Sequence, residues 1–575
     1  MSFAEGQKPT VKGQSFGEFR TIRIPKGQGE IFANLSGERT KFKRILFVFL
    51  FEIAFFRNLF LFLFLKGVLI MWNSIIETIE KVNSAINGVV WGWPMIIMIL
   101  GTGLLVTIRL KVMQVRKLGE SINTTIVPAV KSIGKKKDKN KKENSISQFE
   151  AFSAAISGTV GTGNIIGVTS AILSGGPGAV VWMWISAFFG MLTNYAENVL
   201  GLFYRKKDKD GNFSGGAFYY IAYGLKQKWL GYVAAFFCLF AAVGMSGVQT
   251  NKISGTLSET LKMQSNSDKL IIGAVVAVLT AIVIIGGIKR IGNVASKIVP
   301  LMSLLFILMS VAIIAMNYKV IPASFSAIFS NVFSAKAAFG GAGGYVFAKV
   351  IQKGLARGVF SNEAGLGSSV IAHSASEVKE PVKQGLWGIF EVFFDTFIIC
   401  TLTALVIITT NVSKFSTAFF ETYENADAVI ALDAFGSLGA VGTVIYSLII
   451  PLFAFTTILA WSYYGEQATR FCAQKLSKKG QDISVLVFKT IFVALIVAAA
   501  IIEADLLWAL DDTFNGLMAI PNLIAVVLLS GQVVKITKNY YARKKGIDVE
   551  PMLSAYPEQN EEFKKEIPEG QLYMD

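Results

Sequence analysis

The chain has 575 residues, of which 53% are hydrophobic and only 16% are charged, and its formal net charge is +16. The apolar residues gather in stretches of about 17 to 25 residues, the length that crosses the hydrocarbon of a bilayer. This composition excludes a water-soluble globular protein and predicts many membrane spans. The basic residues lie between the apolar stretches, where they report membrane topology, so the charge does not indicate nucleic-acid binding.

Residues 1–70 differ from the rest of the chain. A polar, basic start precedes residues 45–65, where Glu52 and Arg57 interrupt a phenylalanine-rich stretch, and a charge at the centre of a membrane helix costs about 2.5–3.5 kcal/mol. Three interpretations stay open: an additional membrane helix, an interfacial or targeting segment, or upstream DNA translated from a wrongly assigned start. We favour the third, because codons for residues 66–68 can resemble a bacterial ribosome-binding site shortly before Met71.

Eleven apolar stretches of spanning length follow residue 71. They lie at about 89–108, 152–173, 179–203, 230–261, 270–286, 298–316, 337–375, 386–410, 438–465, 485–502 and 514–534. Residues 109–142 hold eleven Lys or Arg against two acids, and basic loops stay on the cytoplasmic side. The alternation of later loops then predicts a multi-pass protein of the cell membrane with a cytoplasmic C-terminal tail.

The three cysteines and the single histidine limit which disulfides, metal sites and catalytic groups the chain can form. His373 has no second histidine or cysteine nearby, and Cys238, Cys400 and Cys472 show no paired spacing. We therefore predict no disulfide, no metal cluster and no cofactor. An intramembrane enzyme needs a nucleophile with its base, or a metal set, so we do not expect an enzyme.

Glycines interrupt the first span of the predicted core. The run GTVGTGNIIG places Gly158, Gly161, Gly163 and Gly167 in mid-span, although each glycine costs about 1 kcal/mol in a helix interior. A close helix-packing face explains Gly163 and Gly167, which stand four apart, but not the other two. We favour an unwound segment, whose amides attract an anion and whose freed carbonyls attract a cation.

A second break lies in residues 357–373, RGVFSNEAGLGSSVIAH. Two interpretations of Glu363 stay open, a functional carboxylate at membrane depth or a structural acid paired with a neighbour such as Arg357 or Lys353. Asp395, in the next span, either assists ion coupling or bonds a neighbouring serine or amide. Two interrupted spans at matching places in two halves predict a transporter site near the membrane midplane.

Five motifs resemble the alanine or glycine:cation symporter family. They are GTVGTGN (158–164), GGPGAVVWMWISAFFGMLTNYAE (175–197), FSNEAGLGS (360–368), AWSYYGE (460–466) and AIPNLI (519–524). The match runs in order from about residue 71 to 540. It implies an all-α polytopic fold of the leucine-transporter type, a five-plus-five inverted repeat preceded by one extra helix. It also implies sodium-coupled uptake of small neutral amino acids, chiefly alanine or glycine.

The resemblance divides the chain into five parts. These are an atypical N-terminal extension (1–70), an extra transmembrane helix with a basic cytoplasmic loop (71–148), a first repeat half (149–336), a second repeat half (337–540) and a cytoplasmic tail (541–575).

The resemblance also implies the site residues. The backbone of Thr162, Gly163 and Asn164 would bind the amino-acid carboxylate, and Ser361, Asn362 and Gly365 would face the ammonium group. Further pocket residues would be Gln249, Thr457 and Trp461, the last two on one helical face. For Gln249, an interhelical hydrogen bond is an equally open interpretation.

For sodium we expect the carbonyls of Ser157 and Val160 with the hydroxyls of Thr456 and Thr457. Alternating access is the expected mechanism. A proton-coupled carrier of the same fold and, from a different class, a channel are the alternatives.

Overall fold

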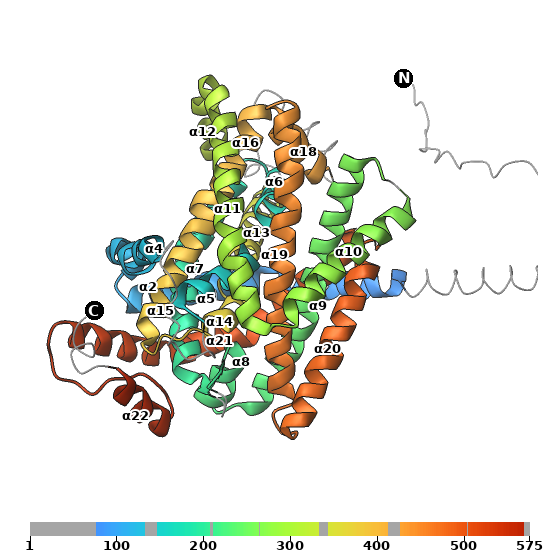
Figure 1. Ribbon diagram of the computed structural model, residues 1–575. Helices are drawn as coiled ribbons and strands as arrows, with labels where there is room; N and C mark the ends of the chain where they lie inside the picture. The colour runs from blue at the N-terminus through green and yellow to red at the C-terminus, as the bar shows by residue number, and fades with distance from the viewer. Residues whose placement is uncertain are drawn as a thin grey trace, which may run out of the picture. The chain divides into compact units, whose positions relative to one another are not determined.

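A computed structural model describes residues 76–132, 146–207, 211–263, 265–332, 343–411, 426–502 and 504–567, without the side chains of 129, 130, 132 and 343–349. The predictions for residues 1–70 lie outside this part of the chain. The chain divides into two units, Met1–Ile79 and Glu80–Asp575. The second unit contains every predicted site residue, and the fold is described for it (Figure 1).

Eight helical segments of the described part are long and apolar enough to cross a membrane. They are α7 (Ala179–Tyr204), α9 (Lys228–Leu261), α10 (Asn266–Ile284), α11 (Gly287–Met316), the continuous segment Pro381–Asn411, α19 (Ala440–Cys472), α20 (Lys478–Ala499) and α21 (Ala504–Lys544). The segment Pro381–Asn411 comprises α15 (Pro381–Val392), the π-helical turn η6 (Phe393–Cys400) and α16 (Thr401–Asn411).

Two bent helix pairs raise the number of spans in the described residues to as many as ten. One joins Ile76–Val90 to α2 (Trp93–Arg109) with a bend of 41°, and the other joins α5 (Gln148–Thr159) to Thr162–Gly175 with a bend of 55°. The second bent pair contains the short 3₁₀ turn η2 (Thr162–Asn164) and α6 (Ile166–Gly175). Ten of the eleven predicted spans coincide with these segments.

The eleventh predicted span, 337–375, corresponds to α13 (Gly343–Asn362) and α14 (Ser369–His373). Three basic residues in the sequence of α13, Lys349, Lys353 and Arg357, make it less apolar than the others, so composition alone does not identify it as a span. With it, one helical span precedes two sets of five, and each set opens on an interrupted helix. This is the five-plus-five organisation that was predicted, and the all-α polytopic fold class is confirmed.

Short elements lie between the spans and, in the case of α22, after α21. They are α3 (Met113–Arg116), α4 (Leu118–Ser132), β1 (Lys206–Lys207), β2 (Phe213–Ser214), α8 (Ala217–Tyr219), η3 (Tyr220–Gly224), η4 (Tyr318–Val320), α12 (Ile321–Ser330), α18 (Asp427–Gly436) and α22 (Pro557–Glu566). The two strands pair antiparallel, with Lys206 opposite Ser214 and Lys207 opposite Phe213.

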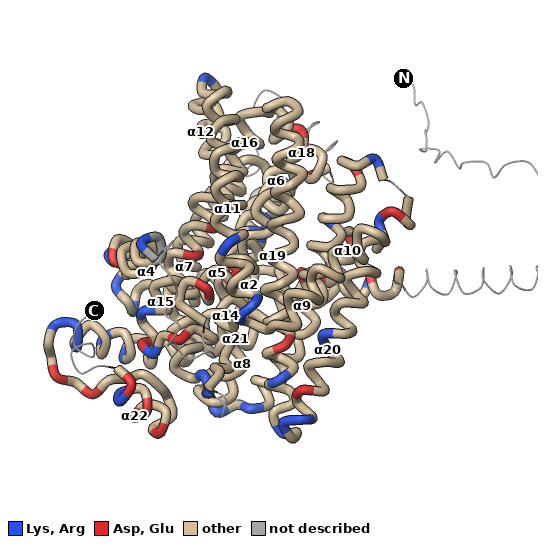
Figure 2. Tube along the Cα trace, in the orientation of Figure 1, with Lys and Arg blue, Asp and Glu red and all other residues tan. Residues whose placement is uncertain are grey.

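Helix α19 lies in the middle of the bundle, against α9, α5, α11 and α20 (Figure 1). Every residue from Thr456 to Thr469 is buried, so this helix is enclosed on all sides at that level. In contrast, α20 exposes Leu486, Val487 and Ile491, and such apolar surface on a membrane helix faces lipid. Figure 2 shows Lys and Arg at the lower ends of α19 and α20, where a basic loop was predicted.

The start of α5 is fixed by a capping box. The Ser147 hydroxyl accepts the amide of Glu150, and the Glu150 carboxylate accepts the amide of Ser147, which satisfies two amides at the helix N-terminus. Just before it, Ile146 forms a parallel bridge with Ser376, and its carbonyl accepts the amide of Glu377 at 2.8 Å. The entry to the first interrupted helix therefore contacts the exit of the second.

The C-terminal segment packs onto the loop that follows α7. Phe563 of α22 is fully buried with Phe213 and Leu553. The guanidinium of Arg205, also fully buried, stacks on Phe213 at 3.7 Å and donates to the carbonyls of the loop after α14, at 3.0 Å for the first, Ser374. This segment is therefore part of the folded protein.

We expect Phe563→Ala to release α22. Truncating a buried phenylalanine costs about 3–5 kcal/mol, and Phe563 anchors this helix in the small apolar cluster with Phe213 and Leu553. Hydrogen exchange at residues 557–566 should rise steeply, while exchange in α19 stays unchanged. Glu558→Ala, at an exposed position of the same helix, is the control and should leave exchange as in the wild type. Equal protection in both variants would contradict this account.

Candidate functional site

The first break is defined by where its backbone hydrogen bonds go. In a continuous helix the Gly161 amide would donate to the Ser157 carbonyl. It donates instead to Oδ1 of Asn164 at 2.9 Å, and the Asn164 amide donates to the Gly161 carbonyl at 3.3 Å. The carbonyls of Ser157 and Val160 therefore lose their helical donors, and the Ser157 carbonyl accepts the Thr457 hydroxyl at 3.0 Å.

Gln249 of α9 joins this unwound segment from the side. Its Oε1 accepts the hydroxyl of Thr162 at 2.9 Å and the Thr162 amide at 3.4 Å. Opposite it, a Cβ placed on Gly161 would lie 2.6 Å from Oγ1 of Thr457. Only glycine fits at position 161 without displacing Thr457. The structure thus brings Thr162, Gln249 and Thr457 to the same break.

Asp395 connects the two breaks, although sequence analysis left it out of the site. Asn164 donates from Nδ2 to Oδ1 of Asp395 at 2.6 Å and to Oγ of Ser361 at 2.9 Å. The Ser361 hydroxyl in turn donates to Oδ2 of Asp395 at 2.8 Å. All three side chains are buried. Asp395 lies in the π-helical turn η6, a local widening of a helix that often marks functional positions.

The second break begins where α13 ends. Glu363 has a left-handed φ of 55°, and Gly365 and Gly367 have φ of 98° and 75°, which a helix cannot accommodate. The Gly365 amide donates to Oε1 of Glu197 at 3.1 Å, and its carbonyl accepts Nδ2 of Asn522 at 2.9 Å. Asn522 also donates to Glu197. Residues of α7 and α21 therefore hold the unwound backbone of the second break.

Three predicted site residues, Asn362, Gly365 and Thr456, form hydrogen bonds away from the first break. Asn362 donates to Oγ1 of Thr396 at 3.1 Å and accepts the Ala364 amide at 3.0 Å. The partners of Gly365 lie on α7 and α21. The hydroxyl of Thr456 points toward α11, 3.7 Å from the Met302 sulfur, and bonds carbonyls of its own helix.

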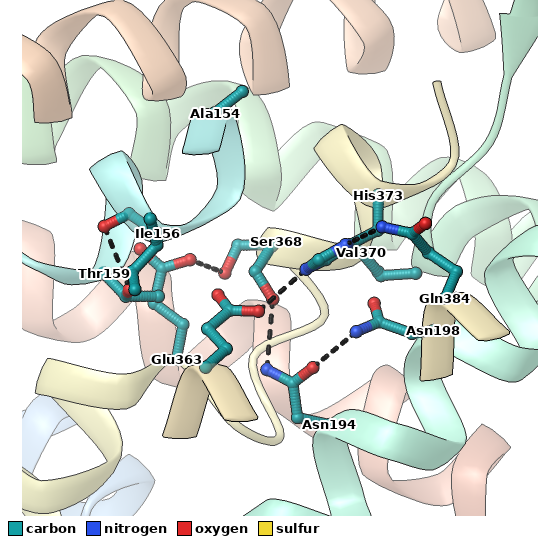
Figure 3. Close-up of polar contacts among 12 residues, drawn as sticks. Ala154, Ile156, Thr159, Asn194, Asn198, Glu363, Ser368, Val370, His373 and Gln384 are labelled. Carbon is teal, nitrogen blue, oxygen red and sulfur yellow. Dashed lines mark hydrogen bonds and ion pairs between the residues drawn. The ribbon is translucent and has the colours of Figure 1, made fainter. Parts of the chain in front are cut away.

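Glu363 and Trp461 form a direct contact between the second break and α19. The indole nitrogen of Trp461 donates to Oε1 of Glu363 at 3.2 Å. The Ser368 hydroxyl donates to Oε2 at 2.5 Å (Figure 3). Both Glu363 and Trp461 are buried. Arg357, the partner considered for Glu363 from the sequence, pairs with Asp512 at 3.3 Å.

Aromatic rings cover one side of the first break. The Phe360 ring lies where a Cβ on Gly163 would be 3.4 Å away, and it packs on Trp508 with ring centroids 5.2 Å apart. Arg357 lies over both rings, 5.4 Å and 5.1 Å from their centroids. Lys252 lies 5.8 Å from the Trp508 ring.

Sequence reasoning missed the groups that hold the second break. Glu197 and Asn522 lie within motifs that carried the family resemblance, and the signal was a polar residue inside an apolar span.

The single histidine has two side-chain partners. His373 is buried between Glu391, at 2.8 Å, and Gln384, at 2.6 Å (Figure 3). Within the described ranges no group of three His, Cys, Asp or Glu is placed to hold a metal ion.

Comparison with known proteins covers most of the chain. A family model described as the sodium:alanine symporter family matches residues 76–553. The sodium/alanine symporter AgcS of Methanococcus maripaludis is 39% identical over 469 residues, 81% of this chain and 97% of that protein. An uncharacterized transporter of Haemophilus influenzae is 39% identical over 81% of this chain and 97% of its own length. GlnT of Bacillus subtilis, a probable sodium/glutamine symporter, is 34% identical over 82% and 92%.

Gly161→Ala should destabilise the bundle by about 1–3 kcal/mol, because overpacking a tight interior site has that cost and the new Cβ would meet Thr457. Thermal unfolding of the detergent-purified protein measures the loss. Gly101→Ala in α2, where a Cβ meets no atom within 4 Å, is the matched control and should be neutral or slightly stabilising. A Gly161→Ala protein as stable as this control would count against the close approach of the first break to α19.

Proposed function

Because the chain belongs to the sodium:alanine symporter family, a family of transporters and not of enzymes, we propose that it imports alanine or glycine together with sodium by alternating access. The observation that supports this most directly is the contact between the two breaks, from Asn164 to Ser361 and Asp395. It joins the unwound segment of the first break to the end of α13, directly before the second break in the other repeat half. Such a junction is where a transporter of this architecture binds substrate.

The carboxylate of the amino acid is proposed to bind the backbone of Thr162, Gly163 and Asn164. The backbone amides of Thr162 and Asn164 donate hydrogen bonds of 3.4 Å and 3.3 Å, which are longer than the usual 2.9–3.0 Å. A carboxylate oxygen makes shorter and stronger bonds to such donors. These amides therefore lose little when they exchange their present acceptors for a substrate.

The ammonium end is proposed to lie toward Ser361 and Asp395. Ser361 was assigned to this role with Asn362 and Gly365, and the buried carboxylate of Asp395, 2.8 Å from the Ser361 hydroxyl, adds the negative charge that an ammonium group requires. Gln249, bonded to Thr162, completes the polar side of the pocket. Asn362 and Gly365 contribute by shaping the second break.

The coupling sodium is proposed to bind the freed carbonyls of Ser157 and Val160 with the hydroxyl of Thr457. These are hard oxygen donors on two elements, the interrupted helix and α19, and the hydroxyl already lies 3.0 Å from the Ser157 carbonyl. Thr456 was assigned to the same cage. To bind sodium there, the Thr456 hydroxyl must turn away from the carbonyls of its own helix. We therefore propose that Thr456 contributes less to sodium binding than Thr457.

The outer barrier is proposed to consist of Phe360 and Trp508 with the Arg357–Asp512 ion pair. The pair links α13 to α21 at 3.3 Å, and both rings lie beside Arg357. Asp512 lies in the first turns of α21, and residues 503–512 hold four acids and no base, which favours the outer side of the membrane. Opening this barrier gives access to the pocket from outside, and a rearrangement at the cytoplasmic end releases substrate inward.

The chain is a multi-pass membrane protein, and we propose the cell membrane as its location, with the C-terminal tail in the cytoplasm. The basic ends of α19 and α20 and the excess of Lys and Arg in residues 109–142 support this orientation.

Proteolysis of sealed membrane vesicles tests this orientation. A protease applied to inside-out vesicles should remove α22, and right-side-out vesicles should protect it.

Thr457→Ala should raise the sodium concentration for half-maximal alanine uptake about tenfold, since one oxygen ligand is lost. The measurement is sodium titration of uptake into proteoliposomes at fixed pH. Thr457→Ser keeps the hydroxyl and is the matched control. Thr456→Ala should shift the same value by less than about threefold. Unchanged sodium dependence in Thr457→Ala would exclude this cage.

Asp512→Asn should open the outer barrier. Cys400, buried beside Ser361 with its sulfur 3.1 Å from the hydroxyl, then reacts faster with a small membrane-impermeant thiol reagent added from outside, by about tenfold. Saturating alanine should slow the reaction. Cys400→Ser identifies the labelled residue. Equal rates with and without the Asp512 carboxylate would show that this ion pair is not part of the barrier.

One experiment tests the proposed function as a whole. Counterflow of labelled alanine and glycine in proteoliposomes, with and without sodium and at two pH values, separates sodium coupling from proton coupling by the same fold. Sodium-dependent, saturable counterflow is expected. Counterflow that follows the proton gradient and ignores sodium would favour the proton-coupled carrier, and flux without saturation would favour a channel.

A further inference from the structure

Glu363 occupies a backbone position that disfavours it. Its φ of 55° is in the left-handed region, where a residue with a Cβ costs roughly 1–2 kcal/mol and where glycine or asparagine is usual. Its amide still donates to the Val359 carbonyl at 2.8 Å, and its carbonyl accepts the Leu366 amide at 3.0 Å. The residue therefore ends α13 at a cost that glycine would avoid. Strain of this kind points to a side chain with a role.

The carboxylate of Glu363 connects two elements. Oε2 accepts the Ser368 hydroxyl from the start of α14, and Oε1 accepts the Trp461 indole from α19. Neither donor carries a charge. The side chain is 1% exposed, so water does not replace either bond. Glu363 therefore fixes the position of α14 and of the Trp461 ring at once.

The Trp461 ring belongs to the proposed pocket through the family resemblance, and its contacts fix its orientation. It is fully buried and packs edge to face on Tyr464, with ring centroids 5.3 Å apart. Its one polar atom donates to Glu363. The flanking Ala460 and Tyr464 lie against Gly158, where a Cβ would be 3.3 Å and 2.7 Å away. Oε1 of Glu363, which accepts the indole, lies 3.4 Å from the same Cβ position. The indole contact therefore borders the last turn of α5, which leads into the first break.

We propose that Glu363 is a positioning residue for side-chain selectivity. It rests on the proposed function, and it adds that the carboxylate holds the Trp461 indole in the orientation that excludes amino acids larger than alanine. Glu363 acts through Trp461 and does not itself bind the substrate. Loss of the bond frees the ring to turn, and longer side chains then enter the pocket.

Two variants of Glu363 separate reach from charge. Glu363→Asn suits the left-handed backbone but is one methylene too short to accept the indole. Glu363→Gln keeps the reach, since its amide oxygen accepts the indole and its NH₂ donates to Ser368. In proteoliposomes, the ratio of alanine to 2-aminobutyrate or glutamine uptake should fall about tenfold in Glu363→Asn, the size of one lost buried hydrogen bond. It should stay within about twofold of wild type in Glu363→Gln.

Matched variants test whether the effect passes through the indole. Ser368→Ala removes the other donor and should leave the ratio unchanged. In a Trp461→Phe background, which lacks the indole N–H, adding Glu363→Asn should change the ratio no further. If Glu363→Asn does not yield monodisperse protein, Glu363→Asp, equally short but still charged, serves in its place with the same expected ratio.

The outcomes are distinct. If Glu363→Asn or Glu363→Asp slows the uptake of all substrates equally, with an unchanged uptake ratio, the positioning role is overturned. The same holds if Glu363→Asn changes the ratio as much in the Trp461→Phe background as in the wild type. Loss of transport in Glu363→Gln alone would instead assign the role to the charge and would also overturn the proposal. A wild-type protein that transports no neutral amino acid would contradict the proposed function itself, independently of these ratios.

Discussion

The structure depends on one constraint, that a peptide group inside an apolar bundle needs a hydrogen-bond partner when its helix stops. Each interrupted helix meets it with side chains. At the first break, Asn164 replaces the lost turn by accepting the Gly161 amide, and Thr457 donates to the Ser157 carbonyl. At the second, Glu197 and Asn522 take the two groups of Gly365. These bonds link α7, α19 and α21 to the breaks.

The two breaks solve the same problem with different chemistry. The backbone groups of the first break bond the neutral side chains of Asn164, Gln249 and Thr457, and the carboxylate of Asp395 reaches the break only through the Asn164 side chain. The backbone groups are therefore free to exchange partners. The second is held by carboxylates, Glu197 and Glu363, with bonds that span to neighbouring helices. We infer that the first break is the adaptable partner in binding and the second the rigid one. Asp395, shared through Asn164 and Ser361, connects them.

Much of this organisation was predictable from the sequence, and the reasons are local. Span lengths, basic loops and mid-span glycines at 158–167 are read directly from composition and spacing. The role of Asp395 stayed open because its two alternatives, ion coupling or a bond to a neighbouring serine or amide, differ only in which side chains meet in space. Glu197 and Asn522 were missed because a polar residue in a span does not reveal its partner, and their common partner Gly365 lies far away in sequence. The orientation of Thr456 toward α11 was equally inaccessible, since adjacent threonines look alike in a sequence.

The packing of α22 has a practical consequence for anyone who handles this protein. A count of membrane spans suggests that the chain can be shortened after α21 or extended freely at its end. Yet Phe563 fills a small apolar cluster, and Lys207 and Lys379 pair with acids of the last helix. Shortening there would uncover Phe213 and the buried Arg205 next to the exit of the second interrupted helix. A purification tag or fluorescent reporter is therefore better separated from Glu566 by a generous flexible spacer, and functional assays should keep the full C-terminal segment.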